Sequence, residues 1–193
     1  MPKRTPIYSL ACIALIAGCT DTPAPTAPAN SLAAARGVAE PLAAGEAGRP
    51  VATVRLKDAC DPATFAGVPG GCQRNGGMKL DQFIATLTRL QTVPAWAITP
   101  PDLFLKEGDE YIAANVGGET HTFTEVDEFG GGIVPLLNQL AGITEVAPEC
   151  AAITPGEFIP SGGSSPTHDA EPGDEKYQCC IHPWMRMTVH TRS

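Results

Sequence analysis

The chain has 193 residues, a formal net charge of −8, 20 glycines, 19 prolines and 7 cysteines. This length allows one domain with a sizeable core, and the negative charge removes the electrostatic basis for binding nucleic acid, so no such partner is expected. Seven cysteines are many for a reducing compartment and indicate an oxidising one.

The N-terminus has the pattern of a secretory signal. Lys3 and Arg4 precede an apolar stretch at residues 7–17, which is too short to span a bilayer comfortably. The ending Leu15-Ile-Ala-Gly-Cys19 resembles the bacterial lipobox, whose cysteine carries the lipid. We therefore predict a signal peptide at 1–18, lipidation of Cys19, and a domain anchored to the cell envelope that faces the periplasm or exterior. An ordinary signal peptide or an uncleaved anchor is the alternative.

Residues 19–50 are rich in alanine, proline, glycine and threonine and have almost no large apolar side chains. Such a segment cannot bury enough apolar surface to offset the entropy of ordering it. It is predicted to be a disordered tether that connects the lipid anchor to a folded domain at 51–193.

The folded domain reads mainly as short strands. Residues 51–57 alternate apolar and polar side chains, as do 121–126. Residues 103–106 and 111–115 read as two strands joined by a tight turn at Gly108. Two further strands are expected at 175–180 and 186–191, with irregular chain at 127–172. The pattern is typical of an antiparallel sandwich or barrel.

One helix interrupts this pattern. Residues 81–91 have a helical apolar face, and Pro94 follows. The residues of that face are Phe83, Ile84, Leu87 and Leu90. The helix is expected to pack on the core and to have no further role.

The C-terminal region combines soft sulfur with imidazole. Cys179, Cys180, His182 and Met185 lie within seven residues. Thiolate, imidazole and thioether together are the ligands of mononuclear copper sites. Neighbouring side chains of a strand point to opposite faces, so Cys179 is expected to face the metal and Cys180 to face away.

Two residues within this loop have predicted supporting roles. Pro183 stiffens the loop and cannot donate a backbone hydrogen bond, and Trp184 would shield the metal from water.

A second imidazole must come from elsewhere in the chain. His168 lies in a polar stretch and is predicted to be solvated, and His190 is predicted to be a surface residue. His121 opens a strand after a glycine-rich loop, which suits a ligand that a sheet holds in place.

At this point the chain resembles the cupredoxins. Residues 98–115 followed by His121 are similar to the region around the first histidine ligand of that family. The motif Cys179-x-x-His182-Pro-Trp-Met185 is similar to the short ligand loop of amicyanin-type members. The resemblance implies an all-β, Greek-key cupredoxin-like β-sandwich, with an added short helix and a long loop insertion at about 127–170. It also implies one type 1 copper ion held by His121, Cys179, His182 and an axial Met185.

The resemblance extends to residues around the ligands. Many cupredoxins have asparagine after the first histidine, whereas this chain has Thr122, so only its backbone N–H is expected to serve the thiolate. Asn115 is expected to tie the two ligand loops together. The carboxylates of Glu125, Asp127 and Glu128 are expected to be solvated at a strand end.

Four cysteines remain for disulfides, and they allow three pairings. Cys60 with Cys72 is favoured by the short loop between them, which would leave Cys150 with Cys180. A dinuclear copper centre that uses Cys179 and Cys180 is the alternative.

These features predict a non-enzymatic, monomeric electron-transfer protein that cycles Cu(II)/Cu(I). Its partners would be redox proteins such as a c-type cytochrome or an envelope oxidoreductase, and the exposed residues around His182, Trp184 among them, would be the electron port. An acidic stretch would dock a basic partner; it consists of Asp169, Glu171, Asp174 and Glu175. Copper storage or delivery without redox cycling is the main alternative, and a catalytic copper protein ranks last.

Overall fold

The computed structural model describes residues 50–193. The predicted signal peptide, the lipidated Cys19 and the tether lie outside the described residues. Within residues 50–193, no helix has the length and apolar composition needed to cross a membrane.

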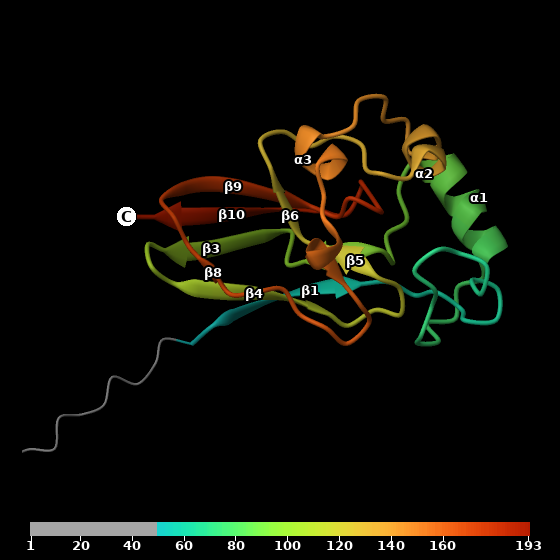
Figure 1. Cartoon of the computed structure of the whole chain (residues 1–193), viewed down its shortest axis with the longest axis horizontal. Coiled ribbons are helices and arrows are strands. Elements are labelled where there is room, and N and C mark those ends of the chain that lie inside the picture. The colour runs from blue at the N-terminus through green and yellow to red at the C-terminus, as the bar shows by residue number, and fades with distance from the viewer. Residues whose placement is uncertain (1–49) are drawn as a thin grey trace, which may run out of the picture. The chain divides into compact units, whose positions relative to one another are not determined.

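The described chain forms a β-sandwich whose two main sheets each have four strands (Figure 1). In sheet order, the first sheet consists of β2 (Ala97–Thr99), β1 (Ala52–Lys57), β4 (Glu110–Asn115) and β8 (His168–Asp169). The second consists of β3 (Asp102–Lys106), β10 (Arg186–Arg192), β9 (Gly173–Gln178) and β6 (Thr124–Val126). A small separate sheet pairs β5 (His121–Thr122) with β7 (Phe158–Ile159).

The core lies between the two main sheets because alternate side chains of each strand point inward. In β1, Val54 and Leu56 are fully buried between exposed neighbours, and in β10 Met187 and Val189 are buried between partly exposed neighbours. The strands predicted at residues 51–57, from this alternation, and at 186–191 are confirmed.

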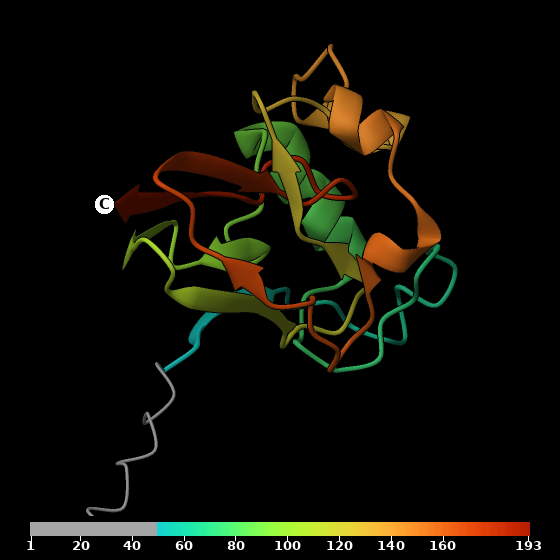
Figure 2. The same cartoon turned by 60° about the vertical axis from the view of Figure 1, so that its left-hand side comes forward.

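Four short helical segments complete the fold: α1 (Leu80–Leu90), α2 (Pro135–Leu140), α3 (Pro148–Ala151) and a 3₁₀ turn at Pro155–Glu157. The helix α1 confirms the predicted helix, although Leu90 stays 43% exposed at its end. Its buried Phe83 contacts the rings of Trp96 and Trp184, with centroids 4.7 and 5.9 Å away. Figures 1 and 2 show α1 beside the loop between β9 and β10. The helix therefore packs against the ligand loop, which the sequence did not indicate.

The predicted hairpin at residues 103–115 is wrong. Strand β3 pairs with β10 and β4 pairs with β1, both in parallel, so the turn at Gly108 passes from one sheet to the other. Two backbone hydrogen bonds fix this turn to neighbouring segments. The Glu107 N–H donates to the Arg192 carbonyl, and the Gly108 N–H donates to the Ala170 carbonyl. Both expected strands exist, but local alternation says nothing about which partner a strand takes.

Residues 127–170 are more ordered than the predicted irregular loop. They contain α2, α3, the 3₁₀ turn, β7 and β8. Within β7, Ile159 pairs with His121 of β5, and Cys150 of α3 is bridged to Cys180. The insertion therefore supports two segments that carry predicted copper ligands. It also divides the predicted strand at 121–126, because β5 pairs with β7 whereas β6 pairs with β9.

Candidate metal centre

Three predicted ligands meet at one end of the sandwich. His121 opens β5, Cys179 follows β9, and His182 lies in the loop that leads to β10. The Cys179 sulfur is 3.8 Å from His121 Nδ1 and 3.7 Å from His182 Nδ1. All three residues are buried, with exposures of 0–3%. The sulfur and both imidazoles thus face one another inside the protein, through the same ring nitrogen of each histidine.

The separations of these donor atoms fit a shared metal ion. Bonds of about 2.0–2.1 Å to nitrogen and about 2.3 Å to sulfur place these two donors about 3.6–3.8 Å apart at tetrahedral to trigonal angles. One thiolate with two imidazoles is the strong donor set of a blue-copper centre. The residues present therefore fit a single copper ion.

The ligand loop is tightly folded by its own backbone. The Cys179 N–H donates to the Met185 carbonyl at 3.0 Å, and the Met185 N–H donates to the His182 carbonyl at 2.9 Å. The Pro183 carbonyl accepts a hydrogen bond from Arg186 Nε at 2.7 Å. Met185 is 1% exposed and packs in the same core cluster as Cys179. The loop therefore buries the predicted axial residue and joins its backbone to that of Cys179.

Thr122 contacts the thiolate through its backbone, as expected. Its N–H donates to the Cys179 sulfur at 3.4 Å, while its hydroxyl accepts the Cys180 N–H at 2.7 Å.

The expectation that Asn115 ties the two ligand loops together is wrong. Its amide donates to the carbonyls of Glu119 and Ile159, at 2.7 and 2.8 Å, and therefore fixes the loop before His121.

Two carboxylates that were not predicted from the sequence face Nε2 of His121 and His182, the ring nitrogens that point away from Cys179. Asp58 Oδ2 lies 2.9 Å from His121 Nε2, and Glu119 Oε2 lies 3.6 Å from His182 Nε2. Trp96 Nε1 donates to the same Glu119 oxygen at 2.6 Å. The carboxylates of Glu125, Asp127 and Glu128 are exposed, as expected, and make none of these contacts.

The three residues that were not predicted lie at the same end of neighbouring strands in the first sheet. Asp58 follows β1, Glu119 follows the parallel strand β4, and Trp96 precedes the antiparallel strand β2. Parallel pairing of β1 with β4 brings the two strand ends together. Glycine at 117 permits the close approach, because a Cβ there would collide with the Asp58 carboxylate. Only knowledge of the strand pairing would have revealed this cluster.

The electrostatics of the buried cluster favour an ionised thiol. Burial alone would raise the pKa of Cys179, but hydrogen bonds with His121 and His182 hold that pKa well below its usual value. Burial would lower the pKa of His121, yet Asp58 and Cys179 raise it to about 9. Burial raises the pKa of Glu119. A thiolate is the form of cysteine that binds metals, so the cluster is prepared for an ion.

The remaining cysteines form two disulfides, Cys60–Cys72 and Cys150–Cys180, which leaves Cys179 as the free cysteine of the described residues. The favoured pairing is confirmed. Cys180 packs in a separate cluster with Cys150, away from the core cluster that contains Cys179. The disulfide removes Cys180 as a metal ligand, so the dinuclear alternative is wrong.

The exposure of the remaining histidines differs from one to the next. His168 is only partly exposed, contrary to the expectation that it is solvated, because its ring packs on Tyr111, Phe123 and Tyr177. His190 is near the surface as expected and lies between Asp174 and Asp102. His182 is 3% exposed, so its ring edge does not reach solvent.

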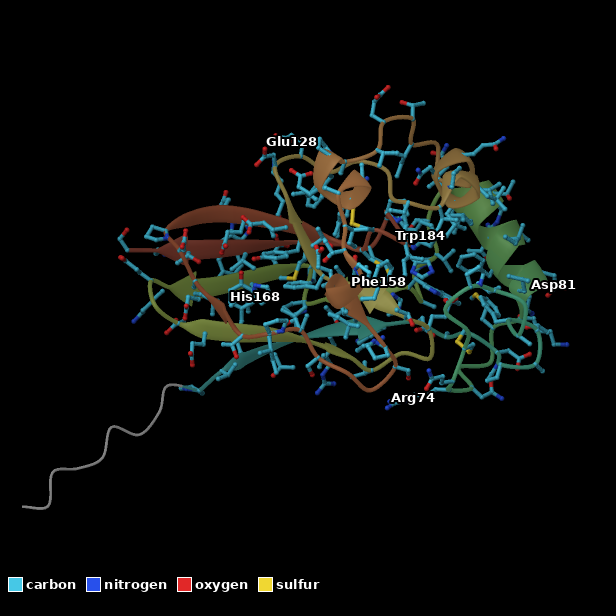
Figure 3. All side chains as sticks on the ribbon, in the orientation of Figure 1. Arg74, Asp81, Glu128, Phe158, His168 and Trp184 are labelled. Atoms are coloured by element: carbon cyan, nitrogen blue, oxygen red, sulfur yellow. A yellow bond between two sulfur atoms is a disulfide. The ribbon has the colours of Figure 1, made fainter. Side chains whose placement is uncertain are left out.

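Trp184 packs against the edge of the His182 ring. Its ring meets that of His182 edge-on at 5.6 Å, and it lies between the strands and α1 (Figure 3). The predicted shielding by Trp184 therefore agrees with the packing, and Trp184 itself is partly exposed, so the electron port formed by residues around His182 stays a prediction.

The structure is similar to solved structures of a cupredoxin and of amicyanin variants. A purple cupredoxin from Nitrosopumilus maritimus is 14% identical and matches 73% of this chain and 99% of its own, with a TM-score of 0.40. An oxidized amicyanin variant is 14% identical over 77% of this chain and 88% of its own, with a TM-score of 0.37. A reduced amicyanin variant is 22% identical over 48% of this chain and 70% of its own, with a TM-score of 0.32.

The described domain is cupredoxin-like. No protein-family model and no curated protein matches the chain. Since these identities and TM-scores are low, the case for a copper site in this cupredoxin-like domain rests on its own donor atoms.

Proposed function

We propose that the chain is a type 1 copper electron-transfer protein. The observation that supports this is the buried convergence of His121 Nδ1, His182 Nδ1 and the Cys179 sulfur, with Met185 packed on the same loop. A thiolate with two imidazoles and a weak thioether is suited to one-electron exchange by copper and poorly suited to binding a substrate.

The protein's own residues supply the rigidity that electron exchange requires. The backbone hydrogen bonds of residues 179–185 close the ligand loop, and the Cys150–Cys180 bridge fixes it to α3. Burial of all three strong donors excludes water from the centre. Little rearrangement is then needed when the charge of the centre changes.

The setting of the domain is part of the same proposal. Lipidation at Cys19 and a tether at 19–50 would hold the domain on a bacterial membrane, facing the periplasm or exterior. Its partners would be redox proteins such as a c-type cytochrome. The acidic side chains of Asp169, Glu171 and Asp174 are exposed and would be available to a basic partner surface, at the ends of β8 and β9 away from the ligand loop.

Copper titration combined with voltammetry tests the proposal. The protein should bind one copper ion and give one reversible one-electron wave. Met185→Gln should retain the ion and shift the potential, because the axial ligand tunes it. Binding of several weaker ions without a reversible wave would contradict electron transfer and favour storage.

A further inference from the structure

Glu119 is buried beside the candidate metal centre. It is 4% exposed, and it lies in the loop between β4 and β5, two residues before His121. Among the described residues, no lysine or arginine forms an ion pair with it. A buried carboxylate is costly unless hydrogen bonds and a positive charge compensate it. The buried carboxylate of Glu119 is therefore stabilised by hydrogen-bond donors and by any positive charge beside it.

The groups that approach Glu119 show where that charge lies. Both Trp96 Nε1, at 2.6 Å, and His182 Nε2, at 3.6 Å, approach the same oxygen, Glu119 Oε2. The indole has only a donor to offer, so this oxygen is an acceptor. The indole compensates part of the burial cost but brings no charge. Of the two groups that approach this oxygen, His182 is the one that can carry a positive charge.

The two nitrogens of His182 have opposite partners. Nδ1 faces the Cys179 sulfur, and Nε2 faces Glu119. A neutral imidazole that binds a metal through Nδ1 carries its proton on Nε2. A carboxylate behind that proton orients the ring and makes it a stronger ligand. At 3.6 Å the contact is longer than a hydrogen bond, so it acts mainly through charge.

Trp96 holds Glu119 in this place. Its ring packs between Phe65 and Phe83, with centroids 6.0 and 4.7 Å away, and it is 1% exposed. Phe83 belongs to α1 and also contacts Trp184 of the ligand loop. The helix, both tryptophans and Glu119 thus form one packed group that covers the His182 edge.

We propose that Glu119, held by Trp96, is a positioning residue for His182 and the buried counter-charge of the ion at this centre. The inference rests on the proposed copper function and deepens it. A fixed negative charge in a buried site stabilises the more positive, oxidised ion more than the reduced ion. Glu119 therefore lowers the reduction potential of the centre.

Three variants of the full chain separate charge from position. Glu119→Gln retains an oxygen acceptor and removes the charge, whereas Glu119→Leu removes both. Glu128→Gln makes the same charge change at a surface site, where the glutamate side chain is 85% exposed and pairs with Lys176. Reduction potential and Cu(I) affinity, measured by competition with a chromophoric chelator, are the readouts.

The expected results differ for each variant. Glu119→Gln should raise the potential, and Glu128→Gln should leave it unchanged because exposed charges are screened. Glu119→Leu should weaken copper binding about 10–100-fold, as loss of an outer partner of a ligand does. An unchanged potential in Glu119→Gln, or wild-type copper affinity in Glu119→Leu, would overturn the proposal.

A measurement on the metal-free protein separates this inference from the copper function. The ¹⁵N chemical shifts of His182 should show a smaller share of the proton on Nε2 in Glu119→Leu than in the wild type, because the variant lacks the carboxylate that faces this nitrogen. Failure of the wild type to bind copper would refute the copper function and the counter-charge role. An unchanged His182 tautomer in Glu119→Leu would refute positioning by Glu119.

Discussion

Asp58 and His121 form a buried pair in which the carboxylate Oδ2 lies 2.9 Å from the ring Nε2. The two residues are 63 positions apart in the sequence and both side chains are at most 1% exposed. The same carboxylate also accepts the N–H groups of Cys60 and Glu119. Asp58 therefore ties the first histidine to two neighbouring backbone segments.

Replacing Asp58 tests the strength of this link. Asp58→Ala leaves a buried imidazole and two backbone donors without an acceptor, so it should lower the free energy of unfolding by about 3–5 kcal/mol. Asp58→Asn keeps one side-chain oxygen as an acceptor and should lower the free energy of unfolding clearly less. Denaturant unfolding of the metal-free protein measures both values, and equal costs for the two variants would contradict the assigned role.

Thr122 offers a second local test. Thr122→Val keeps the shape but removes the hydroxyl that accepts the Cys180 N–H at 2.7 Å, so it should destabilise the protein by about 1–3 kcal/mol. Thr122→Ser keeps the hydroxyl and should cost less. Thermal unfolding of both variants is the measurement. Equal stability of the valine variant and the wild type would show that this hydrogen bond contributes nothing.

The disulfide Cys150–Cys180 closes a loop of 30 residues beside Cys179. In the chain-entropy view, a bridge of this span contributes about 3–4 kcal/mol. The double variant Cys150→Ala, Cys180→Ala should lose about that much free energy of unfolding in denaturant and should keep Cys179 as a free thiol. A double variant as stable as the wild type would mean that packing around α3 already fixes the loop.

His168 predicts a pH-dependent contribution to stability. Burial lowers its pKa below the usual 6.5, so the unfolded chain binds this proton more readily than the folded chain. Stability from this group is therefore complete above about pH 6.5 and falls as the pH decreases through the folded pKa. His168→Phe, which keeps an aromatic ring on Tyr111, should lose less stability on acidification.

The check on His168 is the difference between two curves. Free energies of unfolding for the wild type and His168→Phe are measured from pH 8 to pH 5 in the same buffer series. The two curves should run parallel at the alkaline end and diverge below about pH 6.5, the ordinary pKa of the group. Parallel curves over the whole range would contradict a neutral, buried His168.

Sequence reasoning identified the groups that lie close together along the chain. Cys179, His182 and Met185 share one loop, and the adjacent Cys179 and Cys180 lie in separate clusters as expected. His121 was found because few histidines exist and one of them opens a strand. The strand at 51–57 followed from its alternating apolar residues.

The features that could not be predicted from the sequence depend on which strands pair. Asp58, Trp96 and Glu119 meet only because β4 lies parallel to β1 and β2 lies antiparallel to it. Local patterns contain no information on such partners, which is also why the expected hairpin at 103–115 failed. The burial of His182 under Trp184 and α1 is a tertiary effect of the same kind.

A visible absorption spectrum tests the central claim most directly. The copper-loaded, oxidised protein is compared with a Cys179→Ser variant, before and after addition of a reductant. We predict an intense thiolate-to-Cu(II) band in the wild type that the reductant bleaches and that the variant lacks. A wild-type protein that shows no such band with copper present would contradict a type 1 centre at His121, Cys179 and His182.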